Sequence, residues 1–142
     1  MNYREAIKED KDFILEANRI INDLSDLNDS TFEKRIDEDL FENRICKSIV
    51  AEIDGNPVGF ILYSYIYWAN LGKGIYLSQT FVKEEYRGKG IHTGLLNEIV
   101  NRETDCHFMT CLVGDENDVI KNTLSKLDFK TSDLITFCKG IN

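Results

Sequence analysis

The stretch Phe81-Val82-Lys83-Glu84-Glu85-Tyr86-Arg87-Gly88-Lys89-Gly90-Ile91-His92 decides the fold of this chain. The apolar run before it predicts a strand. After it, apolar residues recur at helical spacing on one face: Ile91, Leu95, Leu96, Ile99 and Val100. Two glycines and two basic residues therefore lie at a strand-to-helix turn. A helix N-terminus leaves backbone N–H groups unpaired and carries partial positive charge, and glycine lets that backbone approach a ligand closely. The stretch predicts a cradle for a pyrophosphate.

The rest of the chain predicts a sheet with helices on its faces. We expect strands at residues 3–7, 46–53, 58–67, 74–82 and 107–113, and a last strand from Phe129 and residues 134–138. We expect helices at about residues 10–23, 31–42, 91–103 and 115–126. Asp54-Gly55-Asn56 is a hairpin turn signal, and residues 25–30 form a polar break. This order predicts an α+β fold with a mixed, mostly antiparallel sheet, in a single domain of residues 1–142.

Composition excludes several classes of protein. The chain has 142 residues with 42% apolar and 30% charged side chains, which is typical of one globular domain. No apolar run approaches the roughly 20 residues of a membrane span, and the N-terminus lacks a signal-peptide pattern, so we expect a cytoplasmic protein without a membrane partner. The net charge of −8 argues against a nucleic-acid partner, which needs a basic face.

The four cysteines and two histidines do not predict a metal site. None of Cys46, Cys106, Cys111 and Cys138 forms a Cys-x-x-Cys pair, and the two histidines, His92 and His107, make no ligand cluster with them. A free thiol in a strand behaves as a small apolar residue. We therefore expect no bound metal.

The glycine turn resembles the signature of the GNAT superfamily of acetyl-CoA-dependent N-acyltransferases, Gln/Arg-x-x-Gly-x-Gly/Ala. It reads Arg87-Gly88-Lys89-Gly90-Ile91-His92 here, after a matching Val82-Lys83-Glu84-Glu85-Tyr86 context. The downstream family pattern is echoed by Asn117, Lys126 and Phe129. Within the superfamily, residues 58–60, 67–73, 76–77 and 81–82 are similar to diamine acetyltransferases of the spermidine/spermine type.

The resemblance implies a GNAT fold that binds acetyl-CoA in a V-shaped split between the strands ending at Val82 and Val113. Backbone groups of the first strand would pair with the pantetheine, the glycine turn would hold the pyrophosphate, and Asn117 would reach the pantetheine arm. The implied cofactor-binding residues are Phe81, Val82, Arg87, Gly88, Lys89, Gly90, Ile91, His92, Thr93 and Asn117. The implied substrate-binding residues are Tyr76, Ser78 and Gln79. A homodimer is implied by the same resemblance.

Three positions depart from the family pattern. His92 stands where the family has Gly or Ala, and a protonated imidazole there would add an anion contact. Leu124 occupies the position of a tyrosine that protonates the leaving thiolate in many members. Ser78 and Gln79 replace the acidic pair of the diamine enzymes. No residue of this sequence can therefore be assigned as general acid or base.

Two residues keep alternative explanations. Gly94 lies inside the predicted helix, where glycine costs about 1 kcal/mol relative to alanine, so it indicates either close packing or neutral tolerance. Asn117 is either a helix N-cap or a cofactor contact.

The sequence predicts an enzyme that transfers an acetyl group from acetyl-CoA to a primary amine of a small polyamine-like or amino-acid-like molecule. Direct attack by the amine is the expected mechanism. Two alternatives stay open: a catalytically weak or inactive acyl-CoA-binding regulatory module, and an acetyltransferase for protein N-termini or lysines.

Overall fold

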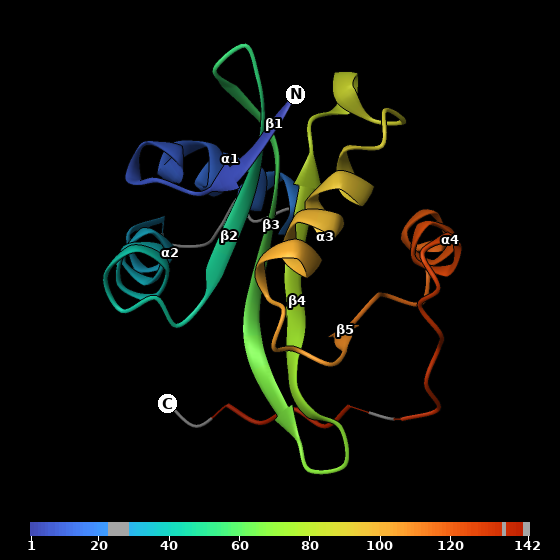
Figure 1. The fold of residues 1–142 in the computed structure, drawn as a ribbon. Coiled ribbons are helices and arrows are strands. Elements are labelled where there is room, and N and C mark those ends of the chain that lie inside the picture. Colours follow the sequence, from blue (N-terminus) through green and yellow to red (C-terminus); the bar gives the residue numbers. More distant parts are fainter. Residues whose placement is uncertain (23–28, 135, 141–142) are drawn as a thin grey trace. The chain divides into compact units, whose positions relative to one another are not determined.

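The computed structural model describes residues 1–22, 29–134 and 136–140 (Figure 1). These residues form two compact units, Met1–Leu112 and Val113–Asn142, and each is described by itself. The prediction of a single domain therefore stays a prediction. The end of the first predicted helix and most of the polar break at residues 25–30 fall outside the described residues.

The first unit is built on a five-stranded sheet. Its strands are β1 (Asn2–Glu5), β2 (Lys47–Ile53), β3 (Asn56–Trp68), β4 (Gly72–Val82) and β5 (Met109–Cys111), in the order β1-β2-β3-β4-β5. All neighbouring strands are antiparallel except β4 and β5, which are parallel. Asp54 and Gly55 join β2 to β3 with φ values of 50° and 77°, as a two-residue turn with both φ positive requires. The α+β fold and mixed sheet predicted from the sequence are confirmed.

Helices cover both faces of this sheet. The helical segments of the first unit are η1 (Lys8–Asp10), α1 (Lys11–Asn22), α2 (Asp29–Ile36), η2 (Asp37–Glu42), η3 (Glu84–Tyr86) and α3 (Ile91–Arg102). Phe60 and Leu62 of β3 pack with residues of α1 and α2, whereas the alternate residue Tyr63 bonds to Glu103 at the end of α3. Side chains alternate between the faces of a strand, so α3 lies on one face and α1 with α2 on the other (Figure 1).

Each face has its own apolar core. On the α1 face, the rings of Phe13, Phe60 and Phe81 meet with centroids 5.8–6.2 Å apart. On the α3 face, the helix buries four of the five apolar residues that its periodicity predicted: Ile91, Leu95, Leu96 and Ile99. The fifth, Val100, is 52% exposed. The helical pattern therefore located the buried stripe, and Val100 lies outside it.

Two predicted elements differ in detail from the structure. The helix expected at residues 31–42 is present as α2 followed directly by η2, a π-helix in which Leu40 is buried at 6% exposure. The last strand, expected from Phe129 and residues 134–138, is absent, because residues 129–134 and 136–140 have no regular structure. A strand needs a hydrogen-bonded neighbour, and the described part of the second unit contains none; Leu134 and Phe137 are 78% and 92% exposed. An alternating apolar pattern cannot supply that neighbour.

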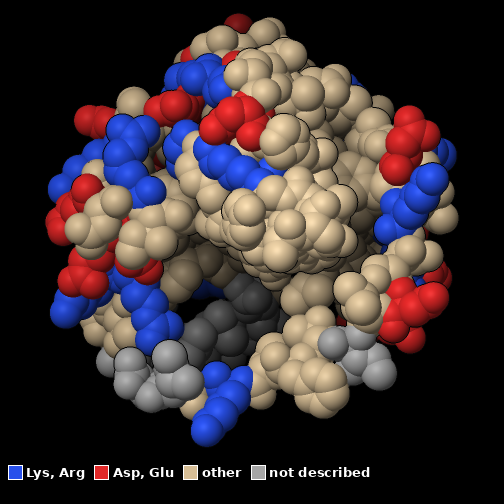
Figure 2. Space-filling model, turned by 60° about the horizontal axis from the view of Figure 1, so that its bottom comes forward, with Lys and Arg blue, Asp and Glu red and all other residues tan. Residues whose placement is uncertain are grey.

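The surface of the first unit mixes both signs of charge. On the face drawn in Figure 2, Lys and Arg lie among Asp and Glu rather than in a separate patch. Ion pairs such as Lys11–Asp37 and Arg44–Glu5 join them. Across the described ranges, no helix is both long enough and apolar enough to cross a membrane.

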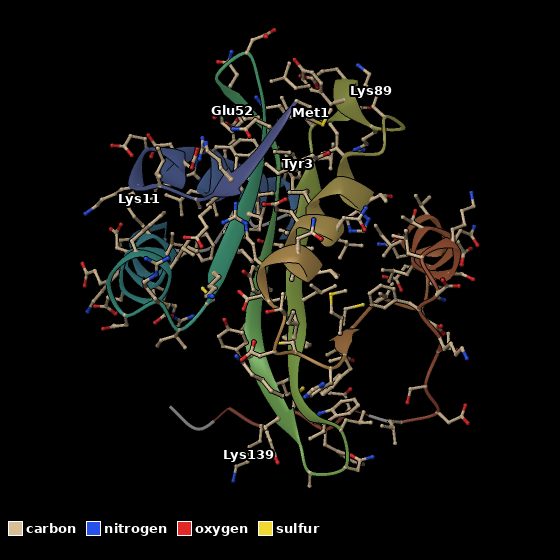
Figure 3. All side chains as sticks on the ribbon, viewed as in Figure 1. Met1, Tyr3, Lys11, Glu52, Lys89 and Lys139 are labelled. Carbon is tan, nitrogen blue, oxygen red and sulfur yellow. The ribbon has the colours of Figure 1, made fainter. Side chains whose placement is uncertain are left out.

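Close packing accounts for the glycine inside α3. A Cβ built on Gly94 would overlap the ring and hydroxyl of Tyr3, which lies on β1 beside the helix (Figure 3). The Tyr3 hydroxyl also donates to Met1 Sδ at 3.0 Å. The absence of a side chain at Gly94 therefore lets β1 and α3 approach each other.

Gly94→Ala is expected to destabilise the protein by about 1 kcal/mol, because overpacking costs about 1–3 kcal/mol and the gain in helix propensity offsets only part of it. In a Tyr3→Ala background the overlap is gone, so the same change should stabilise by up to about 1 kcal/mol. Urea unfolding of the four proteins measures both steps. An equal effect of Gly94→Ala in the two backgrounds would contradict this explanation.

Candidate functional site

The turn between β4 and α3 offers a row of unpaired backbone donors. Gly88 and Gly90 have φ values of 74° and 76°, in the left-handed region that glycine adopts without a Cβ penalty. The first bond of the helix runs from Gly94 N–H to the Gly90 carbonyl at 3.0 Å. Within the described part of the chain, the N–H groups of residues 88–93 find no acceptor. Such a set of N–H groups at a helix start binds anions.

The surroundings of the glycines leave room for a ligand. Both are exposed, and a Cβ on either would meet no heavy atom within 4 Å. Their φ values, rather than packing in the free protein, therefore explain why glycine stands there. The N–H groups of about residues 87–93 were predicted to hold a pyrophosphate. The N–H of Arg87 is already bonded to the Glu84 carbonyl at 3.1 Å, so the cradle consists of residues 88–93.

The cradle has two exposed cationic side chains, Arg87 and Lys89, and one histidine, His92. Arg87 Nε donates to the Val82 carbonyl at 3.0 Å, and Lys89 Nζ lies 5.0 Å from the Tyr86 ring centroid at the turn labelled in Figure 3. Burial lowers the pKa of His92 below its ordinary value of 6.5. Its imidazole is therefore neutral at pH 7, and the cationic contact considered for it is not expected.

The free edge of β4 begins beside a β-bulge. Pairing of β4 with β5 covers Ile75 to Leu77, so residues 78–82 have no strand on that edge among the described residues. The register with β3 shifts at the same place, because Gln79 faces Leu62 and Leu77 faces Tyr63, which leaves Ser78 without an opposite residue. A free edge of this kind can pair with an extended ligand. Phe81 and Val82 lie on it, and their contact with a pantetheine stays a prediction.

The three predicted substrate-binding residues separate around this bulge. Ser78 is exposed and its hydroxyl donates to the Leu62 carbonyl at 3.1 Å. Gln79 points to α1, where its Nε2 donates to Asn18 Oδ1 at 3.0 Å. Tyr76 lies opposite Ser64 and so on the same α1 face of the sheet. The structure therefore places Tyr76 and Gln79 on the same face of the sheet, while Ser78 is the bulged residue at the start of the free edge of β4.

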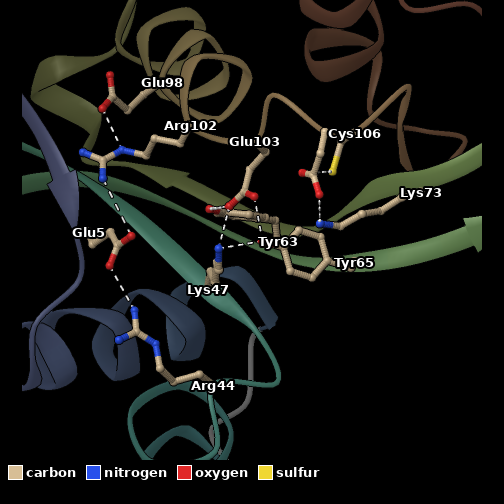
Figure 4. Close-up of polar contacts among 11 residues, drawn as sticks. Glu5, Arg44, Lys47, Tyr63, Tyr65, Lys73, Glu98, Arg102, Glu103 and Cys106 are labelled. Carbon is tan, nitrogen blue, oxygen red and sulfur yellow. Dashed lines mark hydrogen bonds and ion pairs between the residues drawn. The ribbon is translucent and has the colours of Figure 1, made fainter.

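A cluster that the sequence did not predict ties the end of α3 to the sheet. Glu103 is 8% exposed, and its carboxylate accepts from Lys47 Nζ at 2.7 Å, Tyr63 Oη at 2.8 Å and Tyr65 Oη at 2.6 Å (Figure 4). Burial alone would raise the pKa of Glu103, but the hydrogen bonds from Lys47, Tyr65 and Tyr63 outweigh it and lower the pKa. Of the two tyrosines, Tyr63 is buried and Tyr65 is 43% exposed; a buried tyrosine hydroxyl needs a hydrogen-bond partner, but the sequence does not indicate which residue supplies it.

One group beside this cluster has the donor types of a metal site. Ligand atoms of Glu103, Asp105 and Cys106 lie within 4.8 Å of one another. However, the Glu103 carboxylate is already shared by Lys47 and two tyrosines, and Asp105 pairs with Lys73 Nζ at 2.7 Å. These partners neutralise both carboxylates, so the geometry is that of two ion pairs.

The second unit holds the remaining predicted residues. Asn117 is the N-cap of α4 (Asp118–Lys126), and its Oδ1 accepts from Ile120 N–H at 3.2 Å. The N-cap explanation is therefore confirmed, and a cofactor contact stays a prediction. Leu124 is buried at 8% exposure and has no group that can donate a proton.

Comparisons with known proteins agree with this geometry. The acetyltransferase (GNAT) family matches residues 15–129. A thialysine N-epsilon-acetyltransferase from Sus scrofa is 34% identical over 116 residues, which cover 72% of this chain and 66% of the relative. An acetyltransferase from Yersinia pestis is 29% identical over 95 residues, covering 66% of this chain and 64% of the relative. The chain thus spans slightly less than two thirds of each of these two relatives.

Solved structures share the fold over nearly the whole chain. A possible acetyltransferase from Clostridium difficile 630 superimposes with a TM-score of 0.85 at 25% identity, covering 99% of this chain and 97% of that one. The aminoglycoside N-acetyltransferase AAC(6')-Iy in complex with CoA gives a TM-score of 0.83 at 18% identity, covering 99% and 95%. The family match spans most of the sequence and includes the cradle between β4 and α3. The chain belongs to the acetyltransferase (GNAT) family.

Proposed function

We propose that this protein transfers an acetyl group from acetyl-CoA to the primary amine of a small molecule. The observation that carries the proposal is the cradle of residues 88–93, whose N–H groups have no acceptor among the described residues. CoA carries a pyrophosphate that suits this donor set. The aminoglycoside N-acetyltransferase AAC(6')-Iy, which shares the fold, is described in one structure in complex with CoA and in another in complex with a CoA-linked bisubstrate analogue, and this supports the same ligand here.

The residues present fit the ligand in three places. The cradle with Arg87 and Lys89 would hold the pyrophosphate, since both glycines leave open space where a side chain would block approach. The free edge of β4 at Phe81 and Val82 would orient the pantetheine. Arg87 would have to share its guanidinium between the Val82 carbonyl, which it contacts now, and the phosphates.

The chemistry is direct attack. Acetyl-CoA supplies a thioester, and the new C–N bond forms as the C–S bond breaks, with the amine losing a proton and the thiolate gaining one. An alkyl ammonium with a pKa near 10.4 costs about 4.6 kcal/mol to deprotonate at pH 7. The thiolate leaves with a pKa near 8.5, so a protonating residue helps less than a group that favours the free amine. Proximity at the bound thioester supplies a separate part of the acceleration.

The acceptor that we propose is amino-acid-like or polyamine-like. The Sus scrofa relative is named for thialysine, an amino acid with a side-chain amine, and the segment resemblance to diamine enzymes points to a similar primary amine. Tyr76 and Gln79 on the α1 face offer a hydroxyl and an amide for such an acceptor.

Thermal shift and thiol release test the two halves of the proposal. Saturating CoA at 100 times its Kd should stabilise the fold by about 2.7 kcal/mol, whereas pantetheine, which lacks the phosphates, should give a much smaller shift. Amine-dependent release of CoA thiol should then appear with thialysine, lysine or a diamine. A CoA shift without turnover on any amine would instead favour an acyl-CoA-binding module, the second candidate that Leu124 and the neutral Ser78 and Gln79 support.

A further inference from the structure

A row of uncharged side chains, with polar residues on either side of Leu62, crosses the sheet under α1. Ser48 of β2 lies opposite Leu62 of β3, which lies opposite Gln79 of β4. Cross-strand neighbours share a face, and Gln79 bonds to Asn18 of α1 at 3.0 Å, so the row faces α1. Asn18 is 7% exposed and Ser48 is 3% exposed. The face thus carries buried amides and a hydroxyl where the surrounding core is apolar.

This row has hydrogen-bonding capacity that the protein does not use. Gln79 Oε1 and Ser48 Oγ are buried and have no partner in the described residues. Buried polar atoms are nearly always paired. A bound ligand that donates to Gln79 Oε1, beside the β-bulge, would explain why this atom has no partner in the free protein. Gln79 adjoins Ser78, where β4 parts from β5. Its amide therefore lies beside the start of the free edge of β4, along which the proposed acetyl-CoA would bind.

The row is also uncharged. Asn18, Ser48, Leu62 and Gln79 carry no ionisable group. A neutral, partly desolvated environment disfavours an ammonium, whereas a carboxylate would favour it. A neutral amide can still accept a hydrogen bond from the N–H of an uncharged amine. A second ammonium on the acceptor would find no carboxylate in this row to compensate its desolvation.

We propose that Gln79, oriented by Asn18, is a specificity-determining residue that selects a weakly basic amine with a single positive charge over a diamine. The inference rests on the proposed acetyl transfer and narrows its acceptor. Gln79 Oε1 accepts from the attacking amine, and Asn18 holds the amide in position through the bond to Nε2. The same neutrality serves the reaction, because it raises the fraction of acceptor that is the free, nucleophilic amine.

The test compares two acceptors in four proteins. Glycinamide is a weakly basic amine with one charge, and 1,3-diaminopropane carries two. We measure kcat and KM for both by CoA thiol release in the unmodified protein and in Gln79→Glu, Asn18→Ala and Thr80→Glu. The unmodified protein should favour glycinamide in kcat/KM. Gln79→Glu should shift the ratio of the two kcat/KM values toward the diamine by about 10-fold or more, which corresponds to about 1.4 kcal/mol. The shift should come chiefly from a lower KM for the diamine.

Matched controls separate this role from folding and from charge alone. Thr80 is the next residue on β4 and faces the other side of the sheet, where its Oγ1 donates to the Phe60 carbonyl at 3.3 Å. Thr80→Glu adds the same charge there and should leave the ratio within about 2-fold of the unmodified protein. Asn18→Ala should lower kcat/KM for glycinamide, and the CoA-induced thermal shift should persist in every variant.

The outcomes distinguish this inference from the proposed function. Turnover with a preference for the diamine in the unmodified protein, or an unchanged ratio in Gln79→Glu, overturns the inference and leaves acetyl transfer standing. No turnover with any amine removes the proposed function and the inference with it. A ratio that shifts equally in Thr80→Glu overturns the assignment to Gln79.

Discussion

Gly90→Val is expected to weaken CoA binding by about 30-fold or more. Gly90 has a φ of 76°, and the left-handed conformation costs an L-residue about 1–2 kcal/mol, with a β-branched residue at the unfavourable end. If the variant relaxes to a negative φ, the N–H groups of residues 88–93 no longer converge. If it keeps the conformation, the new side chain fills the open space in front of them. Thermal shift and equilibrium binding of CoA measure the loss.

Gly55 provides a matched control for backbone strain. Its φ is 77°, and a Cβ there would also meet nothing within 4 Å, but it lies in the turn between β2 and β3. Gly55→Val should therefore lower the free energy of unfolding about as much as Gly90→Val does, because both place a β-branched residue at a positive φ. It should leave the Kd for CoA unchanged. An equal loss of CoA affinity in both variants would mean that Gly90 acts through general stability and not through the cradle.

The cradle could be predicted from the sequence because it is local. Strand, glycines and helix follow one another within residues 72–102, so the spacing of a few residue types determines where the N–H groups converge. The same locality explains why the hairpins and the buried stripe of α3 were foreseen.

The features that were missed depend on contacts between distant parts of the chain. Glu103 meets Lys47 and Tyr63 across 56 and 40 residues, and no short pattern links them. Gln79 finds Asn18 across 61 residues. The sequence marks Gly94 as unusual within its helix, but its partner Tyr3 comes from the first strand. Sequence periodicity assigns a residue to a face, whereas the opposing side chain depends on tertiary packing.

Glu103→Ala is expected to lower the free energy of unfolding by about 3 kcal/mol. Removing one partner of a buried ion pair costs about 3–5 kcal/mol, because the other charge is left without compensation; Lys47 is 29% exposed, which places the cost at the lower end. The hydroxyl of Tyr63 would lose its acceptor as well. Glu103→Gln should cost less, about 1–2 kcal/mol, since its carbonyl oxygen can still accept from a tyrosine. Urea unfolding at pH 7 measures both.

The same cluster gives the protein an acid-sensitive component of stability. The pKa of Glu103 is held below its ordinary value of 4.5, so at low pH the unfolded chain binds a proton that the folded chain does not. The stabilisation is therefore complete above about pH 4.5 and is lost as the pH falls through the lowered pKa. Glu103→Gln should flatten this part of the pH profile.

Asp105→Asn provides a control at an exposed ion pair with Lys73 in the same region. It should leave both the stability at pH 7 and the pH profile nearly unchanged, because exposed pairs contribute little. A profile that stays as steep in Glu103→Gln as in the unmodified protein would show that other carboxylates carry the acid sensitivity.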